Sequence, residues 1–263
     1  MIKRELKINF KSFIIWLSIL IIMFLFTYSI YPFIITDEAL KSMDELMKIF
    51  PEEVLKTFNM DISSISTAYG WLKTEGFMYI LLIVGLYSSI LGGNILLKEE
   101  NDKTIEYLGF LPIKRSKILT NKITVGILYI ILMVLSLMIF NYIALSLSGD
   151  FEHKEFLLLS VTPILIGLPF FAINIFISSF EHKTKKVLGI NLGLVFIFYI
   201  LSVLSELSSK IEFIKYLSIY TLADTRNVIL RDKINIINII ISLTITIIFI
   251  IGTYIKYNKK ELI

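Results

Sequence analysis

Two pairs of adjacent acids and two histidines are the side chains best suited to acid–base or metal chemistry: Glu52-Glu53, Glu99-Glu100, His153 and His182. Paired carboxylates act as general acids and bases or as metal ligands when a basic partner stands at a fixed spacing. Each acid pair starts the intramembrane-protease pattern Glu-Glu-x3-Arg, but Thr57 and Thr104 occupy the arginine positions. Neither histidine belongs to the zinc-binding pattern His-Glu-x2-His. Cysteine is absent, which excludes thiol catalysis and disulfides. We therefore expect no catalytic residue and no metal site, with an intramembrane protease as the remaining enzymatic alternative.

The polar segment at residues 98–122 has a different kind of pattern. Asp102 suits a helix N-cap, and apolar residues then recur at three-residue steps: Ile105, Leu108 and Leu111. Pro112 ends this helix and can start a second one, because a proline is tolerated in the first helical turn. The second helix carries four basic residues: Lys114, Arg115, Lys117 and Lys122. The pattern predicts an L of two helices suited to docking a soluble protein, although an ordinary basic loop that binds lipid phosphates is an alternative.

The elements that position this segment follow from composition. Hydrophobic residues make up 56% of the chain, charged residues 18%, and mean hydropathy is +0.79, which is more apolar surface than one globular core encloses. Six uncharged runs reach about 18 residues or more: residues 13–35, 77–97, 123–147, 156–180, 187–204 and 234–255. Because a charge at mid-helix costs about 2.5–3.5 kcal/mol on insertion, these runs predict six transmembrane helices. We expect an all-α membrane protein with one domain over residues 1–263.

Orientation follows from the basic residues. With the N-terminus inside, 16 of the 26 lysines and arginines fall on inner segments. The positive-inside rule therefore places both termini in the cytoplasm of a multi-pass protein of the plasma membrane. The first uncharged run is longer than a signal-peptide core, so we do not expect it to be cleaved.

Three further segments are amphipathic. In residues 1–13, apolar residues recur at three- and four-residue spacing and lysines form a neighbouring stripe on the helix. This pattern predicts an elbow helix along the cytoplasmic face or a simple basic anchor. Residues 38–58 carry an apolar face interrupted by Pro51, which predicts two short helices on the outer leaflet. Residues 205–233 mix aromatic and aliphatic residues with isolated charges, and we expect them to dip into the membrane or cap it.

At the polar segment the chain resembles the permease subunits of type-2 ABC exporters. Their pattern is an acid, a short gap, Thr-Ile/Leu-Glu-Tyr/Leu-Leu, then Leu-Pro-Ile-x-Arg before a membrane helix. Nine residues carry the match: Glu100, Thr104, Ile105, Glu106, Leu108, Leu111, Pro112, Ile113 and Arg115. The resemblance implies that residues 98–122, the coupling hairpin, contain a coupling helix that binds a separate ATP-binding subunit, and that residues 181–186 make a second contact. The implied contact residues are Glu100, Thr104, Ile105, Glu106, Tyr107, Leu108, Pro112, Arg115, His182 and Lys183.

The energy source is expected on another chain. The phosphate-binding pattern Gly-x4-Gly-Lys-Ser/Thr is absent, so no cofactor is expected here, and ATP and Mg would belong to the partner. An ion-driven carrier would need ionisable residues inside the bilayer, and the six uncharged runs hold none. Five asparagines are their main polar side chains: Asn94, Asn141, Asn174, Asn191 and Asn238. Hydrogen bonding between helices is their expected role, with substrate contact as the alternative.

Small and helix-breaking residues suggest where helices meet. Pairs of small residues one helical turn apart let two helix backbones approach closely. Such an approach can serve packing within the chain or a dimer seam. Pro163, Gly167 and Pro169 should bend the fourth span and leave carbonyls that need protected surroundings. The expected seam or translocation path comprises Ser88, Ser89, Gly92, Gly93, Asn94, Gly189, Asn191 and Gly193.

These observations predict a permease half-transporter. It would pair with a second permease, identical or related, contact membrane lipid and no nucleic acid, and use an ATP-binding cassette ATPase subunit. Export of amphipathic cargo, such as peptides or antibiotics in antibiotic resistance, is the expected function. A sensing or regulatory complex without export is the alternative.

Overall fold

The computed structural model describes residues 1–34, 67–102, 113–207 and 209–260, with isolated positions between 36 and 49. Within these ranges there are helices and turns and no strand. The long helices are α1 (Ile2–Ile34), α6 (Phe77–Asn101), α8 (Arg115–Ser148), α10 (Pro163–Ser178), α11 (Thr184–Leu207) and α13 (Ile236–Lys259). The short ones are α5 (Ala68–Trp71), η1 (Leu72–Gly76), α9 (His153–Val161), η2 (Ser209–Leu217), η3 (Tyr220–Ala223) and α12 (Thr225–Arg231). Six helical stretches are long and apolar enough to cross a membrane, α9 and α10 together forming the fourth. The predicted all-α class with six spans is confirmed.

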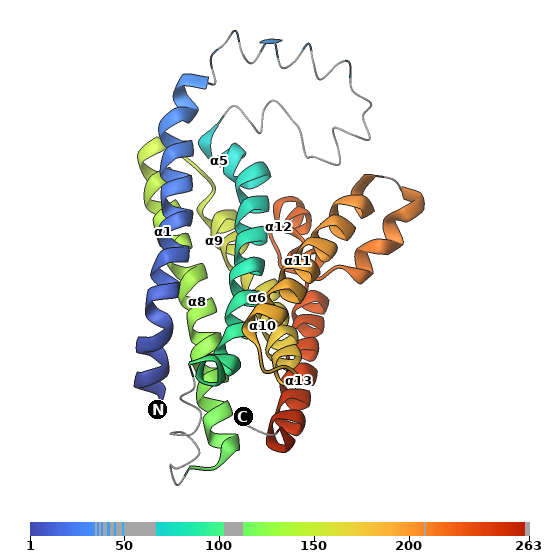
Figure 1. Cartoon of the computed structure of the whole chain (residues 1–263). Coiled ribbons are helices and arrows are strands. Elements are labelled where there is room, and N and C mark those ends of the chain that lie inside the picture. The colour runs from blue at the N-terminus through green and yellow to red at the C-terminus, as the bar shows by residue number, and fades with distance from the viewer. Residues whose placement is uncertain are drawn as a thin grey trace.

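Helices α6 and α10 form the centre of the bundle (Figure 1). In an apolar stretch of 18 residues from each span, 67% of the residues are buried for α6 and 61% for the span that contains α10. The corresponding share is 17% for α1, α11 and α13. Helices α1 and α8 pack together on one side, and α11 and α13 flank the centre on the other. The three peripheral helices therefore expose apolar faces, which suits contact with lipid or another chain.

Glycines permit the close approach at the centre. A Cβ at Gly92 of α6 would lie 2.5 Å from the Phe171 carbonyl oxygen of α10. A Cβ at Gly126 of α8 would collide with the Phe171 ring. A larger residue at Gly92 would have to move backbone, so this glycine sets the α6–α10 distance.

The start of α1 differs from the expected elbow. One unbroken helix runs from Ile2 to Ile34, so residues 1–13 do not form a separate helix. The reason lies on its inner face, where Glu5 and Asn9 are buried and the Leu6 carbonyl accepts a 2.6 Å hydrogen bond from Tyr129 of α8. The lysine stripe, Lys3, Lys7 and Lys11, is exposed. This end of α1 therefore packs along α8.

The fourth span is divided at its first proline into α9 and α10, and the carbonyls that its two prolines leave free are paired. Pro163 begins α10 and Pro169 lies inside it. Neither proline can donate to the carbonyl four residues earlier. The Thr162 hydroxyl donates to the Leu159 carbonyl at 2.8 Å, and the Ser242 hydroxyl of α13 donates to the Leu165 carbonyl at 2.7 Å. Two hydroxyls thus supply the protection that the freed carbonyls need.

The segment after α11 folds back against the bundle. Tyr220 of η3 is buried, with its ring 5.2 Å from that of Phe170 in α10, and α12 packs on α9. This part of residues 205–233 therefore packs on the bundle, and the expectation that it dips into the membrane or caps it stays a prediction. The outer-leaflet helices predicted over residues 38–58, apart from isolated positions, and the coupling-helix residues 103–112 lie outside the described residues.

Candidate functional site

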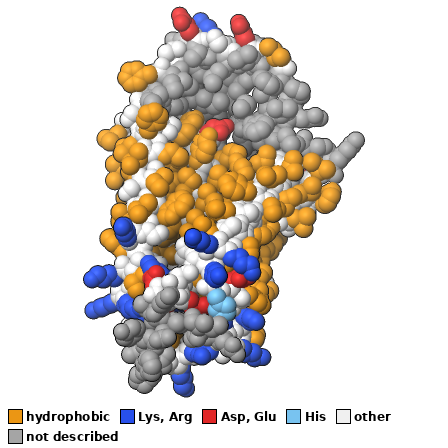
Figure 2. Space-filling model, in the orientation of Figure 1, with side chains coloured by type: hydrophobic (Ala, Val, Ile, Leu, Met, Phe, Trp, Pro, Cys, Tyr) orange, Lys and Arg blue, Asp and Glu red, His pale blue; other side chains and the backbone are white. Residues whose placement is uncertain are grey.

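Helix α1 begins and α13 ends at the same end of the molecule (Figure 1), and charged side chains gather there. Figure 2 shows lysine, arginine and a histidine at this end, beside a belt of hydrophobic side chains. The helices here extend beyond the uncharged runs, so acids and bases lie at or near their ends. Two buried groups organise them, and we name each after its lysine.

The Lys122 triad joins α8 to α6 and α1. Lys122 Nζ donates to both carboxylate oxygens of Glu99, at 2.8 and 2.7 Å, and to Glu5 Oε2 at 3.3 Å. It also donates to the Ile95 carbonyl at 2.8 Å. All three charged residues are at most 3% exposed. Buried charges need such pairing, because removing one partner leaves another desolvated and uncompensated.

The Lys260 triad uses the next residue of α6, Glu100, together with Lys260 and His182. Lys260 Nζ donates to Glu100 Oε1 at 2.6 Å, and His182 Nδ1 lies 2.8 Å from Glu100 Oε2. Lys260 also donates to the Glu181 carbonyl at 2.5 Å. Glu100 and Lys260 are buried, whereas the His182 side chain is 44% exposed. The triad therefore links the end of α6, the α10–α11 turn (residues 179–183) and the segment after α13.

Contacts at both ends of the coupling hairpin complete the arrangement. Arg115 Nη1, at the start of α8, donates to the Lys260 carbonyl at 2.8 Å. Asn101, at the end of α6, hydrogen-bonds Thr184 at the start of α11. The two ends of the hairpin and the α10–α11 turn thus form one connected polar unit.

The predicted ATPase-contact residues divide by placement. Glu100 is buried, whereas Arg115, His182 and Lys183 are exposed. The structure brings Glu100, Arg115 and His182 together through Lys260. The others lie outside the described residues: Thr104, Ile105, Glu106, Tyr107, Leu108 and Pro112.

The predicted seam residues fall into two environments. In α6, Ser88, Ser89, Gly92 and Gly93 are buried and Asn94 is half-buried. Gly92 packs on α10, and a Cβ at Gly93 would collide with the Asn191 amide of α11. A Cβ added at Gly189 or Gly193 of α11 would meet no atom of the described residues within 4 Å. The α6 residues thus pack within the chain, and the α11 glycines face outward.

Three of the five predicted asparagines form hydrogen bonds between long helices. Asn141 accepts a hydrogen bond from Tyr28 at 2.9 Å, and Asn174 donates to Ser89 Oγ at 3.0 Å. Asn191 donates to the Ser89 carbonyl at 3.0 Å. The predicted interhelical role is confirmed for these three, and the bonds of Asn174 and Asn191 tie α6 to α10 and α11.

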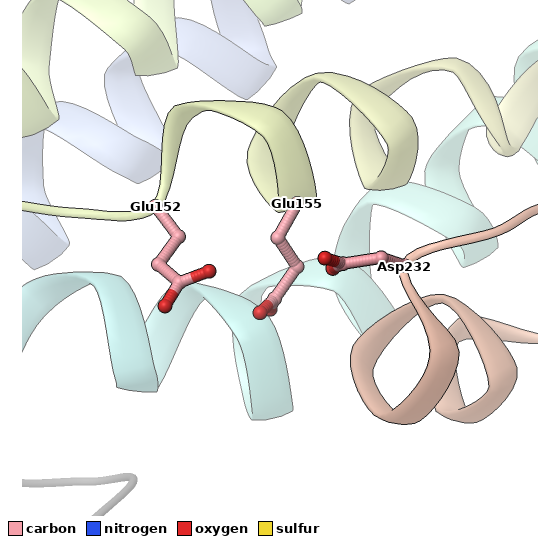
Figure 3. A group of neighbouring side chains, drawn as sticks. All are labelled: Glu152, Glu155 and Asp232. Carbon is pink, nitrogen blue, oxygen red and sulfur yellow. The ribbon is translucent and has the colours of Figure 1, made fainter.

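Three carboxylates form a separate group, Glu152, Glu155 and Asp232 (Figure 3), whose oxygens lie within 4.8 Å of one another. Lysines already pair with two of them, Lys73 with Glu155 at 3.1 Å and Lys154 with Asp232 at 3.4 Å. Glu155 also accepts from Tyr69, and burial, followed by the Glu155 charge, raises the pKa of this phenol. We interpret the group as an ion-pair cluster between α9, α5 and α12.

Four residues of the two triads were not among the predicted site residues: Glu5, Glu99, Lys122 and Lys260. In the sequence they resemble ordinary charges flanking apolar runs. One of them could have been found from the sequence. Glu5 is an acid within the basic N-terminal stretch, and it lies one helical turn from Asn9, so the two polar residues share one face of the helix.

The fold and this site define a multi-pass helical membrane protein with a charged, polar end. The family model for the ABC-2 family transporter protein matches residues 1–262, and the chain belongs to this family. Membership identifies the chain as a membrane permease subunit of an ABC transporter and implies association with an ATP-binding cassette subunit. No curated protein and no solved structure matches the chain.

Proposed function

We propose that this permease exports amphipathic cargo, peptide-like or antibiotic-like, from the cytoplasm and that a separate ATPase drives it from the end carrying the two triads. That end would face the cytoplasm, where the positive-inside rule places lysine and arginine. ATP binding would close the ATPase subunits and shift the coupling hairpin, which would switch access to the transport path.

One observation carries this proposal: the two segments expected to touch the ATPase are joined to each other. Glu100 precedes the coupling-helix residues and Arg115 follows them, and both bind Lys260. His182, on the α10–α11 turn, binds the same Glu100 carboxylate at 2.8 Å. A push on either segment would therefore reach the ends of α6, α8 and α13 together.

The transport path is proposed to lie between two permease copies. A small pocket within this chain, lined chiefly by α6, α8, α9 and α10, has a volume of about 10 Å³, room for one water molecule. Cargo of peptide size cannot occupy it. The outward-facing Gly189 and Gly193 leave α11 free to approach a second copy or a related permease closely.

The test is recovery of the ATPase. The native chain, purified from its own membranes, should retain an ATP-hydrolysing subunit, and Glu106→Ala should lower its recovery or uncouple hydrolysis from transport. Lys154→Ala is the matched control, because Lys154 is exposed and pairs with Asp232, away from the triads. Equal recovery and coupling in both variants would refute the docking role.

The exported class is tested in the reconstituted complex. A panel of cationic amphipathic peptides and peptide antibiotics should stimulate ATP hydrolysis and accumulate inside inverted vesicles. Stimulated hydrolysis without accumulation would point instead to a sensing complex.

A further inference from the structure

Lys260 occupies an unusual position for a lysine next to the end of a helix. Helix α13 ends at Lys259, and Lys260 follows in an extended conformation, with φ −71° and ψ 133°. Only 6% of Lys260 is exposed, although the preceding Lys259 is exposed. A lysine beside lipid headgroups normally extends its amine to water. The inward direction of Lys260 therefore requires specific partners.

Those partners lie on three other elements. The Lys260 amine binds the Glu100 carboxylate of α6 and the Glu181 carbonyl of the α10–α11 turn. The Lys260 carbonyl accepts from Arg115 of α8. One residue thus uses both its side chain and its backbone to hold the two ends of the coupling hairpin and the neighbouring turn.

The last turn of α13 reinforces the contact. Lys256 Nζ lies 4.7 Å from the centre of the Phe180 ring, within the range of a cation–π interaction. Tyr257 is 1% exposed. The end of α13 is therefore fixed against the α10–α11 turn by packing as well as by charge.

We propose that Lys260 is a positioning residue that clasps the segment after α13 onto the ATPase-docking end and makes α13 part of the transmission path. This inference rests on the proposed function. Movement of the coupling hairpin would pull on Lys260, and α13 would carry the movement to α10, on which it packs. Lys260 itself need not touch the ATPase, because it acts through Glu100 and Arg115.

The experiment measures hairpin geometry and ATPase binding in the same variants. The chain has no cysteine, so spin labels can be placed on cysteines introduced at two exposed positions, Lys114 and Lys183. In the complex, Lys260→Met should broaden the distance distribution between the labels. In the chain without labels, the same substitution should weaken binding of the ATP-binding subunit recovered with the native chain by about tenfold, within the range of typical coupling between sites. Lys259→Met is the control and should leave both measurements at the native values.

A double variant separates positioning from stability. Glu100→Gln with Lys260→Met removes both charges, so it should restore much of the thermal stability lost in Lys260→Met. The broad label distances should persist, because the clasp is still absent. Recovery of native distances in the double variant, or native distances in Lys260→Met, would overturn the inference. A native chain that retains no ATPase would instead refute the proposed function, and the transmission role with it.

Discussion

At the residue scale, the Lys122 triad holds two carboxylates against one amine in a dry environment. Glu99 receives both short bonds, and Glu5 receives the longer one at 3.3 Å. Glu5 Oε1 is buried without a hydrogen-bond partner among the described residues. The lysine is therefore the group on which the other two depend, and its removal should affect α1, α6 and α8 together.

Lys122→Met should lower the free energy of unfolding by about 3–5 kcal/mol, because it leaves Glu99 buried without its cation. Denaturant unfolding in mixed micelles measures the change. Lys117→Met is the control, since Lys117 lies on the same helix and is exposed. Equal unfolding free energies for the two variants would contradict the role of the triad.

Neither triad could be predicted from the sequence, for a physical reason. Lys122 and Glu99 border uncharged runs, where a charge usually extends to water, and the pattern cannot show that two helix ends pack together. Glu100 and Lys260 are 160 positions apart. Their pairing depends on how α6 and α13 both pack against α10, which periodicity does not encode.

At the element scale, α10 shows how a helix with an internal proline is kept in an apolar environment. Ser242 of α13 donates to the carbonyl that Pro169 leaves free. The bond also fixes the position of α13 along the axis of α10. The sequence predicted the bend and the need for protection, because proline chemistry is local, but the donor comes from a helix far along the chain.

Ser242→Ala should destabilise the protein by about 1 kcal/mol, since the Leu165 carbonyl then lacks a donor. In a Pro169→Ala background the same substitution should have a much smaller effect, because residue 169 regains an N–H for that carbonyl. Thermal unfolding of the four combinations measures the coupling. Thr244→Ala is the control, as its hydroxyl bonds only the exposed Ile240 carbonyl of its own helix. Additive effects of the two substitutions would show that the Ser242 hydroxyl does not replace the hydrogen bond that Pro169 cannot donate to the Leu165 carbonyl.

At the scale of the whole molecule, the charge distribution predicts sidedness. The uncharged runs located the six spans well, because apolar length is a strong signal, and the basic excess marks one end. Single cysteines at Lys114 and Ser42, both exposed, should react with a membrane-impermeant maleimide from opposite sides. Labelling of Ser42 alone in intact cells is the expected result. Reaction of both from outside would reverse or refute the topology.

The outward glycines of α11 predict association. Gly193→Leu should reduce the dimer fraction in nanodiscs while leaving thermal stability near the native value, because no described atom lies near its Cβ position. Mass photometry measures the fraction. Thr244→Leu, on the exposed face of α13, serves as the control. An unchanged dimer fraction for Gly193→Leu would place the seam elsewhere.

The continuity of α1 has a mechanical consequence. A helix of 33 residues is about 50 Å long, and nothing interrupts it between Glu5 and the far side of the bundle. A helix without a break can tilt as one body. If the Lys122 triad were displaced during an ATP-hydrolysis cycle, a tilt of about 5° would sweep the opposite tip of the rod by about 4 Å. A displacement at the triad would then move the opposite end of α1 on the other side of the membrane, because no break in the helix lies between them.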